Sequence, residues 1–151
     1  MKIVVINGPS LKQLGKREVD VLGRRDYDYL CQTIMKQAAK DNVIVELYQS
    51  NHEGDLIDKI HACSEDKTCG IIINPGAYSH YSYSIYDALR SVDYVKVEVH
   101  IADMYERDES WRHSSVTADA CDKLIMGKGF EGYIEALHYI MEEAGKRGID
   151  A

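Results

Sequence analysis

"GIIINPGAYSH", residues 70–80, is an unbroken apolar run that ends at Asn74 and turns at Pro75–Gly76. An apolar run without polar alternation is typical of a strand buried on both faces, as in a parallel sheet. Asn74 closes the run, so we expect its side chain at the rim of the sheet, where it can hold a ligand hydroxyl. His80 follows just before a helical pattern and can donate to a hydroxyl. The alternatives are that Asn74 ties the turn and that His80 lies on the surface.

The rest of the chain alternates apolar runs with helical patterns. Further apolar runs lie at 2–7, 43–49, 94–100 and 123–127, and helical stripes of apolar residues lie at 30–38, 56–63, 85–92 and 133–144. Repeated βα units predict an α/β fold, a three-layer sandwich in which a five-stranded parallel sheet carries helices on both faces. No linker, repeat or low-complexity segment interrupts the pattern, so residues 1–151 are predicted to form a single domain.

Composition narrows the function classes. The chain has 151 residues, of which 45% are hydrophobic and 28% charged, and a net charge of −7. General nucleic-acid binding needs a basic face, so an anionic ligand must be attracted here by a local cluster of cations. No apolar run approaches the ~20 residues of a membrane span. The first residues enter a strand without a signal-peptide pattern, which favours the cytoplasm. The four cysteines lack zinc-site spacing, and no metal site is predicted.

Polar and turn-forming residues follow four of the predicted strands, at 7–10, 49–52, 74–76 and 98–100. In open parallel sheets, ligands bind beyond the carboxyl ends of the strands, so we expect these segments to converge on one edge. Glu98 and His100 lie two apart on a strand and therefore share a face. A carboxylate beside an imidazole fixes its tautomer and favours its protonated form, which suits a general acid. The alternative is a structural ion pair.

Two long loops carry further candidates. The glycine spacing of "VINGPSLKQLGKREVDVLG" (5–23) fits neither a P-loop nor a dinucleotide fingerprint, but loops this long in small domains are often lids. Its adjacent cations, Lys16 and Arg17, suit a lid that closes over an anion. The second loop, "ERDESWRHSS" (106–115), carries Arg107, Arg112 and His113. It is either a solvated face or a loop that supplies an arginine to a carboxylate.

Two shorter segments are assigned structural roles. Asn51 is predicted to cap a helix whose first turn contains Glu53 or Asp55. The tyrosines of "YSHYSYSIYD" (78–87) hint at a contact between subunits.

Six motifs carry a resemblance to a known family: "INGPSLKQLGKRE", "QSNHEGDLIDKIH", "GIIINPGAYSHYS", "DAL", "VEVHIADMYERDE" and "RHSS". In their order and spacing the chain resembles type II 3-dehydroquinate dehydratases from Met1 to about Tyr139. The resemblance implies a flavodoxin-like domain that assembles as a dodecamer of four trimers. It also implies dehydration of a small-molecule substrate, 3-dehydroquinate, to 3-dehydroshikimate in the shikimate or quinate pathway. Neither a metal nor an organic cofactor is implied.

The implied chemistry needs a base, an enolate stabiliser and an acid, because a proton is removed alpha to a ketone before a beta hydroxyl leaves. In the family, an arginine and a tyrosine on the lid make the base, and an asparagine after Asn-Gly-Pro holds a water on the enolate. The histidine of "EVH" protonates the leaving hydroxyl. Matched to this chain, Arg17 is the lid arginine and His100 is the acid, oriented by Glu98.

The same matching assigns the remaining contacts. Asn74 and His80 match residues that contact substrate hydroxyls. Ile101 and Ala102 match the turn that binds the substrate carboxylate, in which backbone N–H groups do part of the binding. Asp87 matches the acidic residue that reaches a neighbouring subunit's site.

Four residues depart from the family pattern, and all four fall on the implied site. Leu22 stands where the lid tyrosine is expected, and leucine cannot take a proton. Ser10 replaces the water-holding asparagine but can still reach a water, and Ala102 replaces a serine, which removes one hydroxyl donor. Trp111 replaces the arginine that grips the substrate, with Arg112 beside it as the candidate substitute.

Three hypotheses follow. In the first, which the retained Arg17, Asn74, Glu98 and His100 favour, the chain is a working dehydratase whose base is Asp20, Tyr27 or a lid water. In the second, it is a non-catalytic relative that binds a small cyclic hydroxy acid. In the third, it is an enzyme for another substrate, such as one with an aromatic group that stacks on Trp111.

Overall fold

The computed structural model describes residues 1–149, whose five parallel strands form one sheet in the order β2-β1-β3-β4-β5. The strands are β1 (Lys2–Asn7), β2 (Ile44–Gln49), β3 (Gly70–Asn74), β4 (Val95–His100) and β5 (Lys123–Met126). Each predicted strand agrees with the observed one to within one residue at either end. This strand order is that of flavodoxin-like folds, so the predicted fold class is confirmed.

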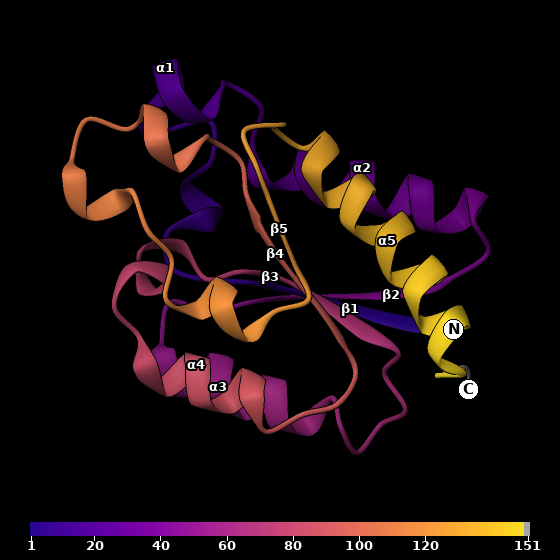
Figure 1. The fold of residues 1–151 in the computed structure, drawn as a ribbon. Coiled ribbons are helices and arrows are strands. Elements are labelled where there is room, and N and C mark those ends of the chain that lie inside the picture. Colours follow the sequence, from indigo (N-terminus) through magenta and orange to yellow (C-terminus); the bar gives the residue numbers. More distant parts are fainter. Residues whose placement is uncertain (150–151) are drawn as a thin grey trace.

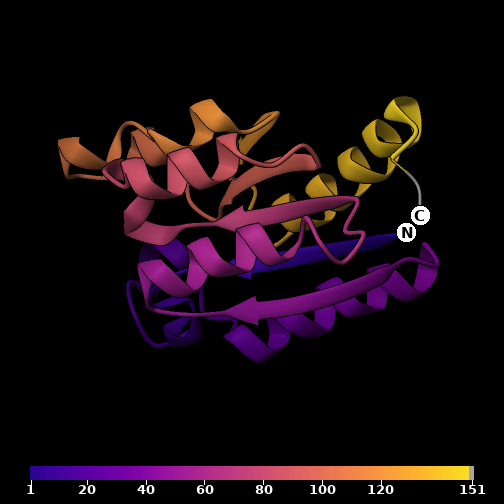
Figure 2. The same ribbon diagram turned by 90° about the horizontal axis from the view of Figure 1, so that it is seen from below.

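Helices cover both faces of the sheet (Figure 1). The α-helices are α1 (Val19–Leu22), α2 (Tyr27–Lys40), α3 (Glu53–Ala62), α4 (Tyr83–Arg90) and α5 (Glu131–Arg147). Helices α2 and α5 lie on one face and α3 and α4 on the other, which makes three layers. Figure 2 shows the strand arrows pointing away from the end of the sheet at which the N-terminus lies. The loops that follow the strands therefore gather at the opposite end.

The connection from β4 to β5 has no α-helix among the described residues. It runs through three short 3₁₀ helices, η3 (Met104–Glu106), η4 (Ser110–Arg112) and η5 (Thr117–Ala120). Two more, η1 (Leu11–Gln13) and η2 (Gly76–His80), follow β1 and β3. Helices η1 to η4 lie in segments that leave the carboxyl ends of strands, the edge at which the sequence places the candidate site, whereas η5 lies just before β5.

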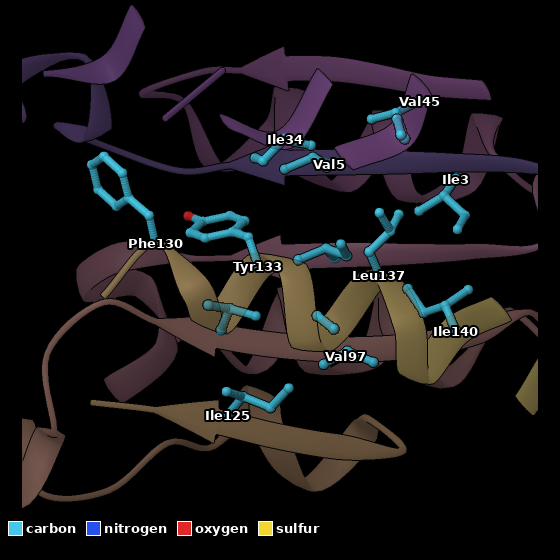
Figure 3. Packing of buried hydrophobic residues seen from close by; sticks show 14 of the residues in the cluster. Ile3, Val5, Ile34, Val45, Val97, Ile125, Phe130, Tyr133, Leu137 and Ile140 are labelled. Atoms are coloured by element: carbon cyan, nitrogen blue, oxygen red, sulfur yellow. The ribbon is translucent and has the colours of Figure 1, made fainter. Parts of the chain in front are cut away.

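The core is divided by the sheet into two apolar clusters. Alternate residues of β1 point to opposite faces, so Ile3 and Val5 enter one cluster while Val4 and Ile6 enter the other. Figure 3 shows the first cluster, in which Tyr133, Leu137 and Ile140 of α5 pack over the central strands. This two-sided burial explains why the strands are nearly all apolar.

The predicted cap of α3 is wrong in one residue. His52, not Asn51, is the N-cap, and it makes no side-chain capping bond. The Ser50 hydroxyl instead links the N-cap to the first turn, because it accepts from the His52 N–H at 3.0 Å and donates to Asp55 at 2.7 Å. The side chain of Asn51 is drawn away because its oxygen accepts the Ser10 backbone N–H at 3.1 Å. Within residues 1–149, no helix combines the length and apolarity needed to cross a bilayer.

Candidate active site

Polar residues from neighbouring strands meet at the carboxyl edge of the sheet. The strand register places Asn7 of β1 beside Gln49 of β2 on one side and Asn74 of β3 on the other. Gly8 lets the next loop pass close to β3, because a Cβ at this position would lie 2.7 Å from the Pro75 carbonyl oxygen. The strand ends thus converge as the sequence predicts.

A pocket of about 150 Å³ opens at this edge. Its walls include most of the residues singled out from the sequence: Ser10, Arg17, Leu22, Asn74, His80, His100, Ile101, Ala102 and Arg112. Arg107 also lines it. Three arginines and two histidines therefore face one small space, and none of the described residues that line it is acidic. The three arginines form the local cluster of cations that an anionic ligand of an acidic protein requires.

Two of the candidate residues lie outside the pocket wall. Glu98 is fully buried behind His100. Asp87 lies exposed on α4 and does not line the pocket of its own chain.

His100 is held by a buried carboxylate. Its Nε2 lies 2.8 Å from Oε2 of Glu98, which leaves the other ring nitrogen for a ligand. Glu98 also accepts hydrogen bonds from the hydroxyls of Ser115, at 2.5 Å, and Thr117. A buried carboxylate is costly unless its oxygens are paired, and here three donors surround it. The sequence did not predict these roles of Ser115 and Thr117. No local pattern indicates that their hydroxyls contact Glu98, which lies 17 residues before Ser115.

Asn74 both ties its turn and faces the pocket. Its oxygen accepts the Gly76 N–H at 3.1 Å, and its Nδ2 donates to the Tyr133 hydroxyl at 3.0 Å. Tyr133, which is fully buried in α5, donates in turn to Asn7 at 2.7 Å. The amide of Asn74 is therefore fixed in orientation by bonds to two separate elements, as a residue that positions a ligand must be.

His80 is oriented by the loop that precedes η5. Its Nδ1 lies 2.7 Å from the carbonyl oxygen of Ser114, so Nδ1 carries the proton and donates. Burial lowers the pKa of His80, which keeps the ring neutral near pH 7. A neutral ring that donates through Nδ1 accepts through Nε2. In this tautomer we expect His80 to accept from a hydroxyl, whereas the sequence suggested that it donates to one.

Glu18 joins the lid loop to the loop after β4. Its carboxylate pairs with Nη2 of Arg17 and, at 2.8 Å, with Nη2 of Arg107. The backbone of Glu18 is left-handed, with φ of 42°, a conformation that non-glycine residues seldom adopt. Strain of this kind is often found at functional sites. The sequence did not single out Glu18, and it included Arg107 only as one of three basic residues on a loop.

The sequence offers Asp20, Tyr27 or a lid water in place of the lid phenol that the resemblance implies. Leu22 itself lines the pocket. Tyr27 begins α2 and packs against the core, and burial raises its pKa to about 12, which makes a phenolate scarce at neutral pH. Asp20 is exposed and lines an adjoining open hollow of about 470 Å³ together with Leu22 and Ala102. Of the two side chains, the geometry therefore favours Asp20 over Tyr27.

Ser10 lies at the pocket with its backbone in the left-handed region, at φ of 67°. The bond from its N–H to Asn51 holds it there. Within residues 1–149, no group of three or more His, Cys, Asp or Glu side chains is arranged to hold a metal ion.

Comparison with known proteins identifies close relatives. The family described as "Dehydroquinase class II" matches residues 1–141. The 3-dehydroquinate dehydratase of Lachnoclostridium phytofermentans is 48% identical over 93% of this chain and 97% of its own length. That of Thermotoga neapolitana is 50% identical over 93% of this chain and 94% of its own. A type II dehydroquinase crystal structure from Butyrivibrio crossotus superposes with a TM-score of 0.91, at 51% identity over 93% of this chain and 97% of that one.

Proposed function

Because the chain belongs to the class II dehydroquinase family, we propose that it is a hydro-lyase that removes water from 3-dehydroquinate to give 3-dehydroshikimate. The observation that carries the proposal is the pocket, in which three arginines and two histidines converge beside a buried carboxylate. A small anionic ring acid suits the three arginines, because they can attract its carboxylate without any general basic surface on the protein.

The proposed steps follow from the geometry. The guanidiniums of Arg17 and Arg107 stabilise negative charge that develops when the proton alpha to the ketone is removed. Ser10 holds a water at the enolate oxygen. His100, kept in one orientation by Glu98, then donates its proton to the beta hydroxyl as that group leaves.

Further residues position the ring. Asn74 contacts one substrate hydroxyl, and Nε2 of His80 accepts from another. The backbone N–H groups of Ile101 and Ala102 hold the substrate carboxylate, and Arg112 adds a guanidinium. These contacts fix the reacting atoms relative to His100, which is a large part of what an enzyme supplies.

Leu22 weakens the base in this proposal. Loss of a general base typically costs about 10²- to 10⁴-fold in rate, so we expect slow turnover in which Asp20 or a lid water accepts the proton. The second candidate function is binding of the substrate without conversion. Leu22 favours this function as well, because leucine cannot take a proton.

One experiment separates these possibilities. Purified protein is mixed with 3-dehydroquinate, and the conjugated enone of the product is followed by ultraviolet absorbance. Leu22→Tyr is expected to raise kcat by about 10²- to 10⁴-fold, whereas Leu22→Phe, which adds the ring without the hydroxyl, is not. Calorimetric binding without turnover in both wild type and Leu22→Tyr supports the binding protein. Absence of both binding and turnover overturns the proposal.

We further propose a cytoplasmic location and an assembly of twelve chains, arranged as four trimers. Asp87 supports the assembly, because it lies exposed on α4 and outside the pocket of its own chain. In a trimer it is free to reach the site of a neighbour. The exposed rings of Tyr81 and Tyr83, close to it in sequence, suit a contact between subunits.

A further inference from the structure

Trp111 and Arg112 are stacked on each other in the loop after β4. The guanidinium carbon of Arg112 lies 4.2 Å from the centroid of the Trp111 ring, well within the range of a cation–π contact. Adjacent side chains in a regular helix do not face each other. The two side chains nonetheless meet here, in the short 3₁₀ helix η4 that carries both residues.

The stacked pair is anchored on both sides. The Trp111 ring meets the His80 ring edge-on, with centroids 5.4 Å apart, and His80 is itself fixed by the Ser114 carbonyl. On the other side, Nε of Arg112 donates to Glu109 at 3.0 Å. Trp111 remains 53% exposed, whereas the side chain of Arg112 is only 16% exposed and lines the pocket.

We propose that Trp111 is a positioning residue whose ring holds the Arg112 guanidinium at the pocket, so that Arg112 can contact the substrate. The inference rests on the proposed function. Among residues 1–149, Glu109 is the hydrogen-bond partner that the structure gives the Arg112 side chain. The two terminal nitrogens therefore remain for a ligand.

This arrangement also bears on the hypothesis of an aromatic substrate. Arg112 covers one face of the Trp111 ring, and the His80 ring lies against it in a T-shaped arrangement. The ring is thus engaged by the protein. The ligand chemistry it serves is that of the guanidinium, whose planar fork suits paired oxygens such as a carboxylate or two neighbouring hydroxyls.

The test is a double-mutant cycle on the full-length protein with 3-dehydroquinate. We expect Trp111→Ala to raise KM by about 2- to 30-fold, the range that a cation–π contact spans, with kcat changed less than twofold. Because Trp111 acts through Arg112, the same substitution in an Arg112→Ala background should leave KM unchanged. Trp111→Phe keeps a ring under the guanidinium and should retain most of the wild-type KM, whereas Trp111→Leu should not.

The matched control is Tyr105→Ala. The ring of Tyr105 is exposed on the same loop, but it does not line the pocket. This substitution should leave KM unchanged. If wild-type protein binds 3-dehydroquinate without converting it, the same comparisons are made on the calorimetric Kd. An equal effect of Trp111→Ala in both backgrounds, or equal effects of Phe and Leu, overturns the inference while leaving the proposed function intact. A wild type that neither binds nor converts 3-dehydroquinate overturns both.

Discussion

Backbone conformation at single residues constrains this site. Ser10 and Glu18 both have backbones in the left-handed region. Residues other than Gly, Asn and Asp are disfavoured in this region. The resemblance to the family implies asparagine at the position of Ser10, and asparagine tolerates this conformation better. The substitution therefore replaces both the group proposed to hold a water and the residue best suited to the backbone.

Ser10→Asn tests the effect of this residue on stability. We expect the free energy of unfolding to rise by about 0.5–1 kcal/mol, because asparagine adopts φ near 67° with less strain. The same substitution should also raise kcat, because the asparagine amide is longer than the serine hydroxyl and should hold the water at the enolate oxygen more firmly. Urea unfolding at fixed protein concentration measures the first effect. Ser10→Ala is the control and should bring no gain, and a less stable Asn variant would contradict the argument.

His80 is expected to titrate below the ordinary range of histidine. Burial lowers its pKa in the folded chain below 6.5, the ordinary value. The unfolded state then binds the proton more readily, so the stability contributed by neutral His80 is present above pH 6.5 and is lost as the pH falls through the folded pKa. NMR titration of the imidazole should give a midpoint below 6.5. A midpoint above 6.5 would contradict this expectation, because it would mean that folding favours the protonated ring.

Loops, more than helices or strands, bring the site together. The lid between β1 and α2 supplies Arg17, and the connection from β4 to β5 supplies Arg107 and Arg112. Glu18 links the two loops by pairing with both Arg17 and Arg107. These pairs are partly exposed, so each contributes modestly to stability, but together they hold two guanidiniums at one wall of the pocket.

Glu18→Gln tests whether this link orders the lid. Glutamine lacks the charge that pairs with two guanidiniums but fits the same backbone, so we expect KM for 3-dehydroquinate to rise about 3- to 10-fold. Amide hydrogen exchange in residues 11–23 should become faster. Lys16→Gln, which removes an exposed lid charge outside the pocket, is the control. Unchanged exchange in Glu18→Gln would show that the lid is ordered by other contacts.

Over the whole molecule, charge is distributed unevenly. The chain carries a net charge of −7, yet the pocket walls hold three arginines and no acidic residue among those described. We expect the arginines to attract a small anion, although Glu18 and Glu109 pair with them, while the acidic remainder of the chain disfavours large polyanions. Attraction of this kind is screened by salt, because the Debye length is about 8 Å at physiological ionic strength.

The proposed assembly makes a direct prediction about mass. Twelve copies of a 17.1 kDa chain amount to about 205 kDa, which light scattering coupled to size-exclusion chromatography measures. We expect this mass at micromolar concentration, because Asp87 and the exposed tyrosines suit contacts between subunits. Recovery of the 17.1 kDa monomer would contradict the assembly and the role of Asp87 in a neighbour's site.

The sequence by itself determined the layers of this protein and the side chains at the sheet edge. Runs such as Ile71–Ile73 and apolar helical stripes report burial locally, and the strands they predict agree with the structure to within one residue. Only the tertiary structure decided that Glu18 meets Arg107, 89 positions away, and that Ser115 and Thr117 surround Glu98. The physical reason is that hydrophobic periodicity records which face of an element is buried, whereas these polar contacts depend on the paths of loops that no local pattern fixes.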